Sequence, residues 1–209
     1  MADASVPSRA SLLLVAVPLT TGCALVAHVV INVALVPGVL GVFLVALLLA
    51  AITWSRLSDD ARARTRRRAL IGVAIGLVST LVYDGTRLAL VAAVGFGFNP
   101  LETVRVFGRL LVGSTAPPLA VAVAGSAYHL ANGIGFATAM ILFIRRPGVR
   151  HGLAWALLLE AAMVSIYPGW LDIRAIDEFI SVSVIGHIAY GLSLGVLARR
   201  FVPREPAPA

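Results

Sequence analysis

The chain has 209 residues, of which 59% are hydrophobic and only 13% carry a charge. This composition excludes an ordinary soluble domain and predicts a polytopic membrane protein. A single cysteine, Cys23, excludes an internal disulfide and any metal site built from several thiolates. The net charge of +7 comes from arginines that lie mostly between the apolar segments, a pattern that orients membrane proteins, so we do not expect nucleic-acid binding.

Three apolar segments occupy the first half of the chain. A bilayer crossing needs roughly 20 apolar residues, so we interpret each segment as a membrane span. Residues 12–36 form the first predicted span, Pro37-Gly38 the turn after it, and residues 39–54 a short second span. The segment from Arg56 to Arg68 contains six arginines, and we interpret it as a topology anchor beside anionic lipid. The third span is expected at residues 69–94.

A short amphipathic helix is predicted at residues 100–112. Asn99 suits the N-cap, and the proline that follows suits the first helical position. Glu102, Arg105 and Arg109 share one face because they are three and four residues apart. The helix is too short and too charged to cross a bilayer, so we expect it on the outer membrane surface.

Three more spans are predicted in the second half of the chain, at residues 117–144, 151–167 and 179–198. Placing both termini in the cytoplasm puts 13 of the 17 arginines inside, three outside and Arg87 within the membrane. The chain is therefore expected to form a single all-α domain. This domain would be a bundle of six transmembrane helices with both termini inside and flexible ends at residues 1–10 and 202–209.

The fourth and sixth predicted spans contain two versions of one pattern. A histidine has small residues four positions before it, four after it and eight after it. The first version is Gly125, His129, Gly133 and Ala137, and the second, 58 positions later, is Ser183, His187, Gly191 and Gly195. This spacing lines up one face of a helix. Small residues let membrane helices approach closely, so the pattern first of all indicates helix packing.

Five titratable side chains from five different spans are expected in one layer, roughly 12 to 18 Å below the outer surface at about 1.5 Å per residue. They are His28, Asp84, His129, Glu160 and His187. Buried ionisable groups in a membrane bundle usually mark a site. Asp84 is expected to pair with Arg87 three residues on, whereas Glu160 needs a partner from another helix or a neutral, protonated state. Each histidine also has a plainer role, a hydrogen bond across a helix interface.

Three hypotheses for the function follow from this layer. In the first, the chain is a membrane enzyme acting on a lipidic or hydrophobic small molecule. Its three histidines bind a divalent metal or a haem, and Asp84 and Glu160 serve as ligand or general base. Arg87, Asn132 and Tyr190 would support this site. The second hypothesis is a small transporter or channel that binds an ion or proton in the same layer. The third is a membrane scaffold or assembly partner that works with another membrane protein or as a homo-oligomer.

Three short motifs carry a resemblance to known proteins. They are His-x-x-Asn-Gly-x-x-Phe at 129–136, Glu160-x-x-Met163 followed by Tyr167-Pro-Gly, and Gly-His-x-x-Tyr-Gly-x-x-Leu-Gly at 186–195. With these motifs the C-terminal half of the chain resembles small bacterial inner-membrane proteins of unknown function. The resemblance implies a multi-pass protein of the bacterial cytoplasmic membrane and leaves the activity open.

Overall fold

The computed structural model describes residues 9–166 and 176–203, and in these ranges every regular element is a helix. The helices are α1 (Arg9–Ala16), α2 (Thr20–Ile31), α3 (Leu35–Ser55), α4 (Asp59–Val94), α5 (Glu102–Val112), α6 (Pro118–Phe143), α7 (Val149–Ile166) and α9 (Ile176–Phe201). Five of them, α3, α4, α6, α7 and α9, are long and apolar enough to cross a membrane. The predicted all-α class and multi-pass character are therefore confirmed.

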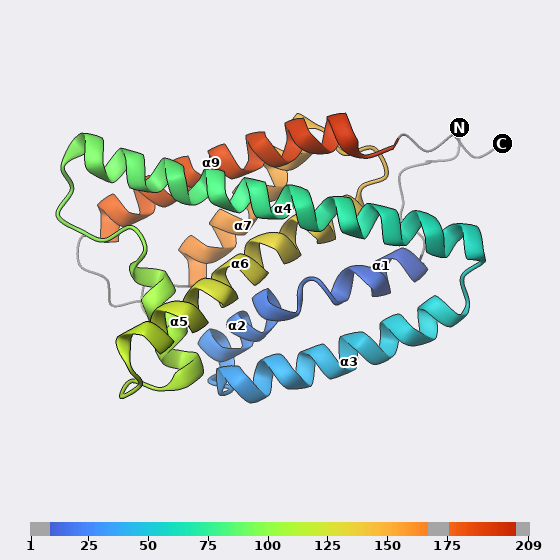
Figure 1. Ribbon diagram of the computed structural model, residues 1–209, viewed down its shortest axis with the longest axis horizontal. Coiled ribbons are helices and arrows are strands. Elements are labelled where there is room, and N and C mark those ends of the chain that lie inside the picture. The colour runs from blue at the N-terminus through green and yellow to red at the C-terminus, as the bar shows by residue number, and fades with distance from the viewer. Residues whose placement is uncertain (1–8, 167–175, 204–209) are drawn as a thin grey trace.

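The chain runs back and forth along one direction (Figure 1). Helices α2, α4 and α7 point one way, and α3, α6 and α9 point the other way. The long helix α4 packs against both α6 and α9, while α7 packs along α9 and α5 lies beside α6 at one end of the bundle. Helices α1 and α2 pack against α3. This arrangement makes α4 the element that can bring side chains of α6 and α9 together.

The first predicted span, residues 12–36, is not one helix. It is interrupted between α1 and α2, where Pro18 has no backbone N–H to continue the helical hydrogen bonds. Local bonds replace them: the Leu19 N–H donates to Ala16 O at 3.2 Å, and the Thr20 hydroxyl donates to Val17 O at 2.7 Å. The 12 residues of α2 cover only about 18 Å, which is too short for a crossing on its own.

The predicted turn at Pro37-Gly38 is wrong. The chain turns earlier, at Asn32, whose φ of 56° is left-handed and ends α2. Pro37 lies in the first turn of α3, where a missing backbone N–H costs nothing because the first N–H groups of a helix have no partner. Helix α3 therefore covers Leu35–Ser55 and exceeds the predicted second span, residues 39–54, at both ends.

Helix α4 begins ten residues before the predicted third span at residues 69–94. Ser58 caps it by accepting a hydrogen bond from the Ala61 N–H at 3.4 Å, and Asp59 and Asp60 in the first turn favour the helix dipole. The 36 residues of α4 extend about 54 Å, well beyond the roughly 30 Å of a hydrocarbon core. Most of the basic segment is therefore helix and not loop.

Arg68, within this basic segment, is not a lipid-facing anchor. Its side chain is buried and donates to the backbone carbonyls of Ile141, Ile144 at 2.6 Å and Arg145 at 3.2 Å, at the C-terminus of α6. The last carbonyls of a helix have no partner within the helix, so a guanidinium group is well suited to cap them. Contact between the other arginines of this segment and anionic lipid stays a prediction.

The helix predicted at residues 100–112 is present as α5, with a start two residues later than expected. Asn99 still helps to form it, because its side-chain oxygen accepts from the Leu101 N–H at 2.9 Å. The predicted polar face is confirmed: Glu102 pairs with Arg105 at 3.2 Å and with Arg109 at 2.9 Å. The opposite face packs against α6.

The last three predicted spans agree closely with α6, α7 and α9, with ends that differ by one to three residues. Residues 167–175, between α7 and α9, lie outside the described residues. So do most of the predicted flexible ends, residues 1–10 and 202–209.

The two stripes of small residues are packing surfaces, as predicted. On α9, a Cβ atom added to Gly191 would lie 2.8 Å from the Ala156 Cβ of α7. On α6, the same test places Gly133 against the Thr80 side chain of α4. Glycine at these points lets the helix axes approach, which positions the histidines between them close to other helices.

Candidate functional site

One face of α4 supplies the centre of the site. Thr80, Tyr83, Asp84 and Arg87 follow the spacing i, i+3, i+4 and i+7, which places them along one side of a helix. Because α4 packs against both α6 and α9, this face can meet side chains from both helices.

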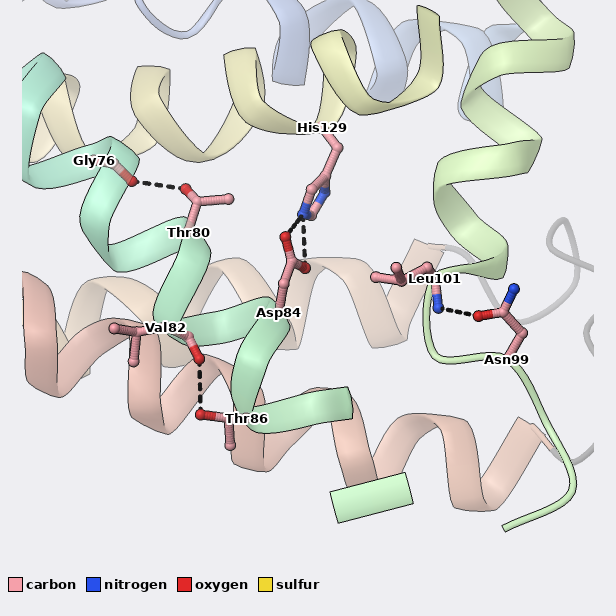
Figure 2. Close-up of polar contacts among 8 residues, drawn as sticks. All are labelled: Gly76, Thr80, Val82, Asp84, Thr86, Asn99, Leu101 and His129. Carbon is pink, nitrogen blue, oxygen red and sulfur yellow. Dashed lines mark hydrogen bonds and ion pairs between the residues drawn. The ribbon is translucent and has the colours of Figure 1, made fainter. Parts of the chain in front are cut away.

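The first contact joins α4 to α6. His129 Nε2 lies 3.0 Å from Asp84 Oδ1 and 3.1 Å from Oδ2, so the two side chains point toward one another (Figure 2). A carboxylate only accepts hydrogen bonds, so Nε2 is the ring nitrogen that donates to Asp84. The other nitrogen, Nδ1, has no hydrogen-bond partner among residues 9–166 and 176–203.

The second contact joins α7 to α9 and is more enclosed. His187 Nδ1 lies 2.8 Å from Glu160 Oε2 and 3.0 Å from the Ser183 carbonyl oxygen. The Ser183 hydroxyl donates to the same Glu160 oxygen at 3.0 Å. Glu160 is 4% exposed and His187 8%, so the two side chains are removed from solvent and held by each other. Two alternatives were expected for Glu160, a partner from another helix or a neutral state, and the structure provides the partner from another helix.

Tyr83 connects the two pairs, although sequence reasoning did not single it out. Its ring centroid lies 6.0 Å from that of His129 and 4.8 Å, edge to face, from that of His187. The Arg87 guanidinium carbon lies 4.9 Å from the Tyr83 ring centre and 5.3 Å from that of Phe179. Its position in the sequence could have identified it, because Tyr83 directly precedes Asp84 and lies four residues before Arg87, on the same face of the helix.

The predicted ion pair between Asp84 and Arg87 is wrong. Within the described residues, Asp84 is taken by His129, and Arg87 forms no ion pair but stacks on two aromatic rings. The spacing of three residues permits the pair, yet partners on α6 and α9 compete with it. Tertiary packing decided the outcome.

Both histidines line one cavity of about 380 Å³. That volume lies in the range of roughly 300 to 1,000 Å³ that is typical of small-molecule sites. Side chains of α2, α4, α5, α6, α7 and α9 form its wall. Leucine, valine, phenylalanine and methionine side chains make the α2, α5 and α7 sides apolar, and the polar members include Tyr83, Arg87, Thr103, His129, Asn132 and His187. The arrangement suits a molecule that is mainly hydrophobic and carries a polar group.

The remaining predicted site residues have different positions. His28 Nδ1 lies 2.8 Å from the Val33 carbonyl oxygen at the turn after α2, and His28 is not among the cavity-lining residues. Asn132 is buried and lines the cavity. Tyr190 lines it too, and its hydroxyl donates to Gly133 O at 2.7 Å, which connects α9 to α6. Four of the five predicted titratable groups therefore form two pairs, and the fifth lies apart.

A metal site from His28, His129 and His187 is not assembled. In the ranges 9–166 and 176–203, no three His, Cys, Asp or Glu side chains come close enough to hold one ion. His129 and His187 each face a carboxylate instead, and the Tyr83 ring packs against both imidazoles. A divalent metal or haem stays a prediction.

Comparison with known proteins adds no assignment. No protein-family model, curated protein or solved structure matches the chain. The geometry of the cavity and of its two histidine–carboxylate pairs is the basis for a functional assignment.

Proposed function

We propose that this protein is a membrane enzyme that acts on a hydrophobic small molecule by acid–base chemistry. One observation carries the proposal: His129 and His187 line the same cavity, and each is held by a carboxylate through one ring nitrogen. The second ring nitrogen of each has no hydrogen-bond partner within the described chain. Such a nitrogen is free to exchange a proton with a bound molecule.

The carboxylates prepare the histidines for this role. A carboxylate that accepts a hydrogen bond from one imidazole nitrogen holds the ring in a single tautomer and orientation, and it stabilises the imidazolium form. Two such pairs at one cavity supply one group that removes a proton and one that returns it. Isomerisation, elimination and hydrolysis all require these two transfers, so the proposed reaction class is proton transfer to and from a bound hydrophobic molecule.

The proposed setting is the bacterial cytoplasmic membrane, with six crossings and both termini inside. Five helices have the length and apolar character for a crossing, and α1 with α2 runs antiparallel to α3 and would form the sixth (Figure 1). The alternating helix directions and the concentration of arginines in alternate connecting segments support this topology.

The experiment compares histidine variants of the protein in lipid nanodiscs. Wild type, H129Q, H187Q and H151Q are incubated with membrane-lipid extract, and the small molecules consumed and formed are followed by mass spectrometry. His151 is the matched control, because it lies in the first turn of α7 and does not line the cavity.

Wild type and H151Q are expected to convert the same molecule. H129Q and H187Q should be slower by at least about a hundredfold, the effect of removing a general acid or base. Equal conversion by all four proteins, or by none, would contradict the proposed enzyme.

A proton-coupled transporter is the second candidate, and one observation favours it. The interruption between α1 and α2 places Leu19, Gly22 and Cys23 at the cavity, and broken helices are common at transporter binding sites. A transporter would give pH-dependent flux into liposomes that E160Q abolishes, without chemical change of the molecule carried. Flux with an unaltered molecule would favour it over the enzyme.

A further inference from the structure

Four of the eight buried polar atoms without partners in the described residues belong to side chains that line the cavity. Within the described residues, Arg87 Nε and Nη2, Thr103 Oγ1 and Asn132 Oδ1 are buried and have no hydrogen-bond partner, and all three residues line the cavity. Most buried polar atoms of native proteins are hydrogen-bonded, so each exception calls for an explanation. A ligand in the cavity would explain all four atoms at once.

Arg87 is the most informative of these residues. Arg87 is 2% exposed, and a guanidinium group keeps its charge even when buried. The Tyr83 and Phe179 rings contact the guanidinium group but accept no hydrogen bond from Nε or Nη2. A buried cation without an anion is costly, particularly inside a membrane.

The carboxylates of the site do not supply this anion. Asp84 is bound to His129, and Glu160 is bound to His187 and Ser183. Arg87 has no ion pair in the ranges that the structure describes. Within the described residues, Arg87 therefore has two buried nitrogen atoms, Nε and Nη2, for which no acceptor is provided.

We propose that the cavity binds an amphipathic anion whose carboxylate or phosphate head pairs with Arg87. Its hydrocarbon part would lie against the apolar side chains of α2, α5 and α7. The planar fork of a guanidinium group suits two-point binding of either head group. Thr103 and Asn132 can bind further polar atoms of the same molecule. This inference rests on the proposed function, because it names the class of molecule that the two histidines act on.

The experiment measures binding to the full chain in lipid nanodiscs by calorimetry. Four probes share one alkyl chain and differ in the head group: octanoate, octyl phosphate, octanol and octylammonium. At least one anion is expected to bind tenfold or more tightly than octanol, with octylammonium weakest. The tighter anion tells whether the head group is a carboxylate or a phosphate.

Variants test whether Arg87 provides this preference. R87Q should lose the tenfold difference between anion and alcohol, and R87K should retain part of it because the charge remains without the fork. R150Q is the control, because Arg150 is exposed in α7 and does not line the cavity, and it should bind as wild type does. R87K and the wild-type head-group series keep the test informative if R87Q fails to fold.

Octanol binding as tightly as both anions would overturn the inference and leave the proposed enzyme standing. Equal anion preference in wild type and R87Q would overturn it as well. Anion binding that depends on Arg87, together with unchanged turnover in both histidine variants, would support the inference and contradict the proposed function.

Discussion

The stripes on α6 and α9 have the same spacing but place their histidines in different surroundings. His129 reaches across to Asp84 on α4, and its side chain is 17% exposed. His187 reaches Glu160 on α7, is 10% exposed in its side chain, and also contacts the Ser183 carbonyl of its own helix. The spacing sets which face of a helix carries the histidine, and the neighbouring helix decides which carboxylate it meets. The more enclosed pair should matter more for stability.

The largest expected effect comes from breaking the enclosed pair. E160A leaves His187 and the Ser183 hydroxyl without their buried acceptor, so it should lower the free energy of unfolding by about 3–5 kcal/mol. D84A breaks the more exposed pair and should cost about 1–3 kcal/mol. Reversible unfolding in bicelles measures both. A larger loss for D84A than for E160A would reverse the comparison.

A smaller effect is expected from filling the close helix contacts. In G191A the new methyl group would lie 2.8 Å from the Ala156 Cβ, so α7 and α9 must shift apart, at a cost of about 1–3 kcal/mol. G133A should cost at least as much, because its methyl group would overlap the buried, branched Thr80 side chain, whose hydroxyl is bonded to the Gly76 carbonyl.

G41A is the matched control for both glycine variants. Gly41 lies in α3 with no atom within 4 Å of an added Cβ, so alanine there should be neutral or stabilising by up to about 1 kcal/mol. Thermal unfolding of the three variants in one detergent gives the order of their stabilities. A loss in G41A as large as in G191A would show that helix contact does not explain the stripe.

The smallest effect is expected for a histidine that does not line the cavity. H28Q should lower the free energy of unfolding by about 0.5–1.5 kcal/mol, the range for losing a hydrogen bond such as the one between this ring and the Val33 carbonyl. Ligand binding and turnover should not change, since His28 does not line the cavity. The same nanodisc assays check both. A loss of turnover in H28Q would show that His28 takes part in the site after all.

Local chemistry was sufficient to predict several elements. The apolar length of residues 117–144 and the proline pair at its start predicted α6 to within one residue at each end. The charge spacing of Glu102, Arg105 and Arg109 predicted the polar face of α5. In these cases the interacting groups are only a few residues apart, so the sequence contains the whole interaction.

The predictions that differ from the structure concern segments for which several local conformations have similar free energies. Pro18 can kink a helix or interrupt it, and Pro37 fits both a turn and the first turn of a helix. The basic segment after Ser58 suits an inner loop by charge and a helix by its cap and its two leading aspartates. Packing against neighbouring helices selects between such outcomes, and a single sequence does not display those neighbours.

The sequence by itself determined that this is an all-α, multi-pass membrane protein with histidines on two small-residue stripes. Hydrophobic length and residue spacing are properties of consecutive residues, so they can be read without a fold. Only the tertiary structure decided that Asp84 pairs with His129 and not with Arg87, and that Glu160 pairs with His187. It also placed Arg87 at a cavity with no acidic partner in the described part of the chain. The paired residues are 45 positions apart for Asp84 and His129 and 27 apart for Glu160 and His187, so only helix packing brings them together.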